Sequence, residues 1–148
     1  MRSRFAIALA LLFCLATAQA AAPEGAEPFV FVGNSLGKTV EFSYYLDVCG
    51  HQATGERLRR LTLKKLDTCP LPASEKESLR SDLKALEADM EARMKGCDAD
   101  ADCALGKRQY CPGMAKSAVE FTALMDEAEK DQTALDRLAG GCELGPRE

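Results

Sequence analysis

Apolar residues recur at every third or fourth position through most of the chain beyond residue 33, which is the spacing of one face of an α-helix. The first run can be capped by Asn34 or Ser35 and stops at Gly50. The second covers residues 54–67 and stops at the prolines after Cys69. We therefore predict an antiparallel pair of helices, the first of them largely buried. Their inward positions are Leu36, Val40, Tyr44 and Val48, with Phe42, Tyr45 and Leu46 beside them, and then Leu58, Leu61 and Leu66.

A third helix is predicted to begin at a capping box formed by Ser74 and Glu77. A last helix is predicted from Pro112, at its first helical position, to Ala139, and a short helix over residues 100–110 precedes it. Because a turn-like insert joins the third and last helices, we expect them to pack antiparallel along one seam. The sequence thus predicts an all-α fold: a small disulfide-stapled bundle of four main helices plus a short helical insert. The seam would hold Leu79, Leu83, Leu86, Met90 and Met94 on one side and Met114, Ala118, Phe121, Met125, Ala128, Leu135 and Leu138 on the other.

The start of the chain has the pattern of a secretory signal peptide over residues 1–20. Arg2 and Arg4 precede an apolar run over residues 5–15, and small residues then allow cleavage before Ala21 or, alternatively, before Pro23. The run is shorter than the ~20 residues of a membrane span. Residues 21–33 are predicted to form an extended arm whose Phe29 or Phe31 packs on the helices, and residues 34–148 the helical domain. We therefore expect an exported protein of the bacterial periplasm or the extracellular space, with no membrane span in the mature chain.

The composition narrows the class further. The 148 residues are 47% apolar and 28% charged, which is normal for one globular domain and excludes a disordered chain. Loss of Arg2 and Arg4 with the signal peptide changes the net charge from −4 to −6. Nucleic acid is therefore not an expected partner, because its phosphates require clustered Lys and Arg. The chain contains no haem, nucleotide or hydrolase-elbow motif, and we expect no cofactor.

Disulfides are predicted from the cysteines. Without Cys14, which lies in the signal peptide, six remain, and none are spaced as the Cys-x-x-Cys pairs of a zinc site. If the third and last helices pack antiparallel, the start of the third helix lies beside the end of the last. Cys69, just before the third helix, would then lie beside Cys142, just after the last helix. We therefore predict Cys69–Cys142, together with Cys97–Cys111 and Cys49–Cys103, while Cys49–Cys111 with Cys97–Cys103 remains open within the second group.

Two groups of residues are candidates for chemistry. His51 is the one side chain that titrates near neutral pH, and Asp47 lies one helical turn before it, as a general base and its partner would. The alternative for His51 is a surface position at a helix end. Asp98, Asp100 and Asp102 alternate like the first ligands of an EF-hand loop, but the Gly and Glu that complete such a loop are missing. Capping of a helix is the alternative for these aspartates, and we predict no metal site.

Arg57, Arg60 and Lys64 share one face of the second helix in an otherwise acidic protein. This basic strip could dock an anionic partner, or it could be a solvated face balanced by the acidic third helix. Two functions are compatible with all these features. The first is an exported, non-catalytic protein that binds a protein or an anionic envelope component, as an inhibitor, immunity or accessory protein does. The alternative is a small secreted hydrolase that uses His51 and Asp47.

Overall fold

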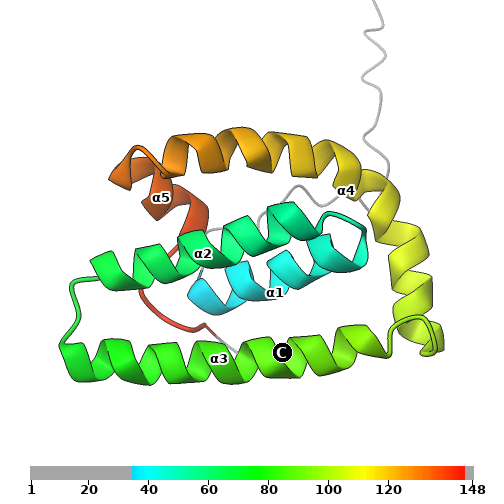
Figure 1. The fold of residues 1–148 in the computed structure, drawn as a ribbon, viewed down its shortest axis with the longest axis horizontal. Helices are drawn as coiled ribbons and strands as arrows, with labels where there is room; N and C mark the ends of the chain where they lie inside the picture. The colour runs from blue at the N-terminus through cyan, green and yellow to red at the C-terminus, as the bar shows by residue number, and fades with distance from the viewer. Residues whose placement is uncertain (1–34, 146–148) are drawn as a thin grey trace, which may run out of the picture.

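The computed structural model describes residues 35–145, which form an all-α domain of five helices (Figure 1). The predicted signal peptide and the predicted arm lie outside the described residues. Within residues 35–145, no helix is both long and apolar enough to cross a bilayer. The helices are α1 (Leu36–Val48), α2 (Gln52–Thr68), α3 (Ala73–Lys95), α4 (Ala101–Ala128) and α5 (Gln132–Ala139).

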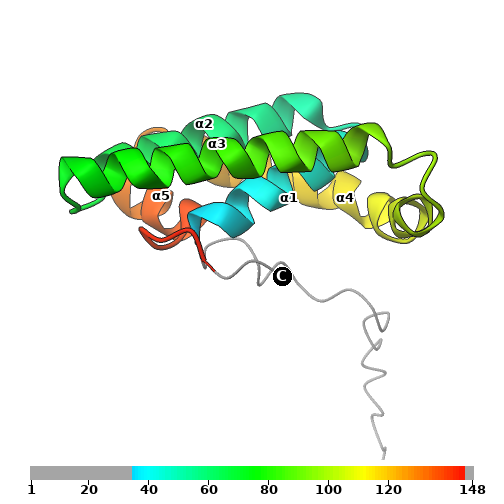
Figure 2. The same ribbon diagram turned by 90° about the horizontal axis from the view of Figure 1, so that it is seen from below.

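The α1–α2 hairpin occupies the middle of the domain, with α3 on one side and α4 and α5 on the other (Figures 1 and 2). The predicted pairing of α1 with α2 is confirmed. The predicted seam between the third and last helices is wrong, because α3 packs mainly on α1 while α4 packs on α5 and α2. The reason is that α1 carries buried apolar residues on more than one face, so both outer layers pack on the hairpin instead of on each other.

The core is therefore divided into two clusters by α1. Met90 and Met94 lie in the cluster beneath α3, whereas Met114 and Met125 lie in the cluster beneath α4 and α5, so the four methionines do not share a seam. The first cluster consists of Phe42, Leu46, Leu58, Leu61, Ala118, Phe121, Met125, Ala128, Ala134, Leu135, Leu138 and Ala139, and the second of Leu36, Val40, Tyr44, Leu66, Leu83 and Met90.

Two predicted helix starts are wrong. The capping box of Ser74 and Glu77 does not form, because the helix begins two residues earlier, with Pro72 at the N-cap and its carbonyl accepting from the N–H groups of Glu75 and Lys76. Pro112 does not begin a helix but lies inside α4, which is visibly bent along its length (Figure 1). A proline inside a helix removes one hydrogen bond and kinks the backbone without having to end it.

The predicted last helix is also divided. α4 ends at Ala128, and α5 begins after Asp131, whose carboxylate accepts from the Ala134 N–H at 2.8 Å. This break lets α5 fold back onto α4 and α2 and places Leu135 and Leu138 in the first cluster.

The disulfides are Cys69–Cys142, Cys49–Cys111 and Cys97–Cys103. The first agrees with the predicted pairing. The preferred pairs Cys97–Cys111 and Cys49–Cys103 are wrong, and the arrangement that was left open is the one observed. Because α4 continues through Pro112, its first turn carries Cys103 beside Cys97, whereas Cys111 lies about 12 Å further along the helix, where α1 ends.

Candidate functional site

The basic strip of α2 lies against the end of α4. The guanidinium of Arg57 donates to Asp126 at 2.6 Å and to Glu129 at 2.8 Å. These hydrogen bonds raise the pKa of Arg57 and lower the pKa of Glu129. The ammonium of Lys64 donates to the Glu129 carbonyl at 3.1 Å, which is a favourable place for a cation because carbonyls at a helix end lack helical partners.

Most of the strip is thus occupied within the fold. Among residues 35–145, Arg60 is exposed and has neither an ion pair nor a side-chain hydrogen bond, whereas Lys64 is exposed but donates to the Glu129 carbonyl. The carboxylates that neutralise Arg57 come from the end of α4. The expectation that the acidic third helix balances the basic strip is therefore wrong. Arg57 and Lys64 thus connect α2 to the end of α4.

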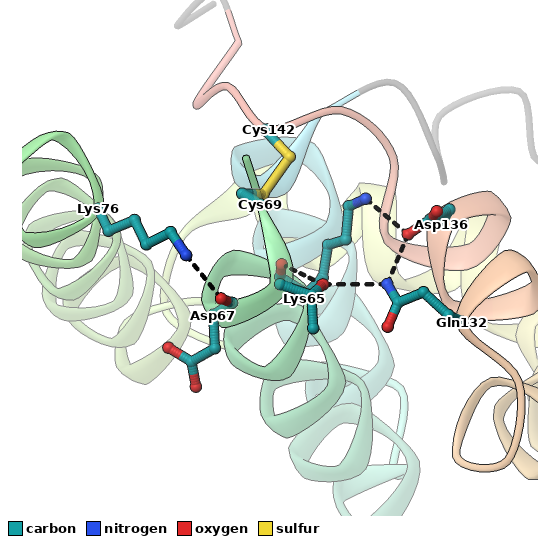
Figure 3. Close-up of a disulfide and its surroundings, with 8 residues drawn as sticks. Lys65, Asp67, Cys69, Lys76, Gln132, Asp136 and Cys142 are labelled. Carbon is teal, nitrogen blue, oxygen red and sulfur yellow. Dashed lines mark hydrogen bonds and ion pairs between the residues drawn. A yellow bond between two sulfur atoms is a disulfide. The ribbon is translucent and has the colours of Figure 1, made fainter. Parts of the chain in front are cut away.

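A second polar group joins α2 to α5 beside the Cys69–Cys142 disulfide (Figure 3). Lys65 is only 8% exposed, and its ammonium is 2.7 Å from Asp136. The Gln132 amide donates to Asp136 at 2.8 Å and to the Thr68 hydroxyl at 3.0 Å. The hydrogen bonds from Lys65 and Gln132 lower the pKa of Asp136. These contacts fix α5 against α2.

His51 and Asp47 do not form a catalytic pair. His51 occupies the N-cap of α2, where its backbone N–H donates to the Leu46 carbonyl at 2.8 Å. Within the part of the chain that the structure describes, no hydrogen bond or ion pair joins its ring to Asp47. The Asp47 carboxylate instead pairs with Arg59 of α2 at 2.8 Å.

Arg59 is the residue around which the α1–α2 contact is organised. Its guanidinium lies 4.5 Å from the centroid of the Tyr44 ring and donates to the Ser43 hydroxyl at 3.0 Å. The second Asp47 oxygen is buried without a hydrogen-bond partner and sits against Gly55. Burial therefore raises the pKa of Asp47, against the opposing charge of Arg59. The sequence shows no sign of this cluster, because its members come from two helices.

Asp47 and Asp136 should affect the pH dependence of stability in opposite directions. The raised pKa of Asp47 means that its charge disfavours the folded state, and that this cost is relieved as the pH falls through the folded-state pKa. The lowered pKa of Asp136 means that its charge stabilises the folded state above pH 3.8, and that this contribution is lost at lower pH.

Urea unfolding from pH 7 to pH 3 measures both contributions. With Asp136→Asn, the loss of stability relative to the wild type should shrink as the pH falls. With Asp47→Asn, the stability relative to the wild type should decline as the pH falls, because only the wild type gains from protonation. Parallel pH profiles for the two variants would contradict the assignment.

The three alternating aspartates have separate roles. Asp100 caps α4 by accepting from the Cys103 N–H at 2.8 Å, and Asp98 pairs with Lys107 at 2.9 Å. Asp102 lies in the exposed first turn of α4. The described residues contain no cluster of three side chains suited to hold a metal ion. Capping and ion pairing thus account for Asp98 and Asp100.

The first half of α4, residues 101–113, contributes no residue to either core cluster. None of its residues is buried, and Leu105 and Tyr110 are 46% and 62% exposed. Nevertheless, Cys103 and Cys111 attach this half-helix to the rest of the domain through two of the three disulfides. In Figure 1 it extends at the edge of the molecule, away from α5. The sequence predicts this half-helix only as a short helical insert, although cysteines that bracket a helical segment without an apolar stripe were the available signal.

A shallow hollow of about 250 Å³ lies between α4 and α5. It is lined by apolar side chains and by charged side chains of both signs: Phe121, Leu124, Ala134 and Leu138, and Glu120, Glu127 and Arg137. This mixed charge selects no particular ligand. The chain matches no protein-family model and is similar to no curated protein and to no solved structure.

Proposed function

We propose that this protein is exported and acts without catalysis, by binding a protein partner through residues 101–113 of α4. The observation that carries the proposal is the use of two disulfides to hold a half-helix that contributes no buried residue. A helical segment of this length is marginal in water on its own. Its attachment therefore preserves the shape of an exposed surface rather than the packing of the core.

Such a surface suits protein recognition. A segment that is ordered before binding loses little conformational entropy when the complex forms. Tyrosine is also enriched among the residues that dominate binding energies, and Tyr110 is the most exposed aromatic residue described. A protein partner is favoured over an anionic polymer, because Arg57 and Lys64 are already engaged by the end of α4.

Export is supported by the signal-peptide pattern and the disulfides together. Disulfides form and persist in oxidising compartments, and all six cysteines outside the signal peptide are paired. The hydrolase alternative loses its proposed dyad, since Asp47 pairs with Arg59 and not with His51.

Site-specific photocrosslinking in the envelope of the source cells tests the binding proposal. A benzophenone amino acid at position 105 should crosslink to one discrete protein, whereas the same group at position 119 should not. Val119 is the matched control because it is 73% exposed and lies on the second half of the same helix. Adding Tyr110→Asp should reduce the crosslink at position 105 at least tenfold, since a hot-spot side chain contributes ~2 kcal/mol or more. Equal crosslinking at both positions would contradict the proposal.

A further inference from the structure

A hollow of about 320 Å³ opens beside the Cys69–Cys142 disulfide, at the side of the domain shown in Figure 3. It lies between the start of α3 and the segment that follows α5. Its walls are Leu71, Leu79, Leu144 and Cys142, with Glu75, Ser78 and Glu143 around them.

This hollow is an open edge of the second hydrophobic cluster. Leu79 and Leu144 both pack against the buried members of that cluster, yet both remain partly exposed. An apolar group placed between them would extend the core to the surface and remove their exposed area from water.

The chain that precedes α1 starts at the wall of the same hollow. The backbone N–H groups of Leu36 and Gly37 donate to the carbonyls of Glu143 and Leu144 at 2.9 and 3.0 Å. Ser35 packs against Gly145, at a position where any side chain larger than hydrogen would collide with the Ser35 hydroxyl. The described part of the chain therefore begins next to two residues that line the hollow, Glu143 and Leu144.

We propose that Phe31, supported by Phe29, occupies this hollow and completes the second cluster. Phe31 is four residues before Ser35, which allows a span of at most about 14 Å, enough to reach a wall that already touches residues 36 and 37. So short a connection gives the ring a high effective concentration at the hollow. Residues 28–34 carry no charge, so acidic side chains at the rim meet no repulsion. In an extended segment Phe29 and Phe31 share one face, while Val30 and Val32 share the other.

Methyl NMR of the mature protein tests the proposal. The Leu79 and Leu144 methyl resonances should be displaced by the ring current of Phe31, and Phe29→Ser/Phe31→Ser should move them by several tenths of a ppm. The same variant should lower Tm by roughly 5–10 °C, as expected for exposing two partly buried rings. Val30→Ser/Val32→Ser is the matched control, and it should change these resonances and Tm much less.

Three outcomes would overturn the proposal. One is that the Leu79 and Leu144 resonances are the same in the wild type and in Phe29→Ser/Phe31→Ser. Another is that both double variants have equal effects, which would indicate non-specific contact of the arm. The third is that the resonances move only when the protein concentration is raised, which would assign the hollow to a second copy of the chain.

Discussion

Replacing Cys69 and Cys142 together by alanine should lower the free energy of unfolding by about 4 kcal/mol, which is a large part of the stability of a domain of this size. The disulfide joins residues 73 positions apart and therefore restricts a long loop in the unfolded chain. In the folded state it ties the residue that ends α2 to the segment whose carbonyls bind the start of α1. Urea unfolding followed by far-UV circular dichroism measures the loss.

The matched control is Cys97→Ala with Cys103→Ala. This pair is only six residues apart, so the loss of loop entropy corresponds to about 2 kcal/mol. If the two double variants lose the same stability, the effect does not come from loop closure, and the native strain of each bridge would have to be considered. If the Cys69/Cys142 variant is as stable as the wild type, the disulfide does not hold the ends of the domain together.

Gly55→Ala should destabilise the domain by about 2–3 kcal/mol, although alanine is the better helix former. α1 and α2 approach each other closely at Gly55, where an added Cβ would lie 2.5 Å from the Ser43 carbonyl oxygen and collide with the Asp47 carboxylate. The carbonyl belongs to the backbone of α1 and cannot move without displacing the helix. The two helices must therefore separate, and the Arg59 contacts with Asp47 and Tyr44 are weakened.

Gly113→Ala is the same chemical change, but it should stabilise the domain. Gly113 lies inside α4, and nothing lies within 4 Å of the position of its Cβ. This substitution should raise the free energy of unfolding by roughly 0.5–1 kcal/mol. Thermal unfolding of both variants measures the contrast. A Gly55→Ala variant that gains stability like Gly113→Ala would mean that α1 and α2 are not in close contact at this point.

Several features of the fold follow directly from local pattern. The spacing of Leu36, Val40 and Tyr44 identifies the buried side of α1, and all three are 8% exposed or less. A helix buries its apolar face wherever its partner comes from, so periodicity alone predicts such positions. The pairing of Cys69 with Cys142 is also predictable, although the seam from which it was derived does not exist. Both cysteines lie at the same end of the domain in either packing order.

The candidate binding surface was not predictable in the same way. Leu105 and Tyr110 look like ordinary core candidates in the sequence, and they are exposed because none of the described helices packs over residues 101–113. The contacts of Arg57 with Asp126 and Glu129 likewise join residues about seventy positions apart. The sequence shows Arg57 as part of a basic strip, but the neutralisation of its charge depends on where α4 ends.

The sequence by itself determines that the protein is helical, where the main apolar stripes of α1 and α2 lie, and that its cysteines form disulfides. These properties depend on spacing within a few residues and on the chemistry of each side chain. The sequence does not determine every buried position, since Tyr45 was predicted to face inward and is 50% exposed. Only the tertiary structure decides that α3 and α4 lie on opposite sides of the α1–α2 hairpin, and that Cys49 is joined to Cys111. An apolar stripe does not specify which other stripe covers it, and the choice depends on how all the faces of α1 are covered at once. The tertiary structure also decides that α4 continues through Pro112. The kink at this proline is tolerated because the Cys49–Cys111 and Cys97–Cys103 disulfides hold the helix in place.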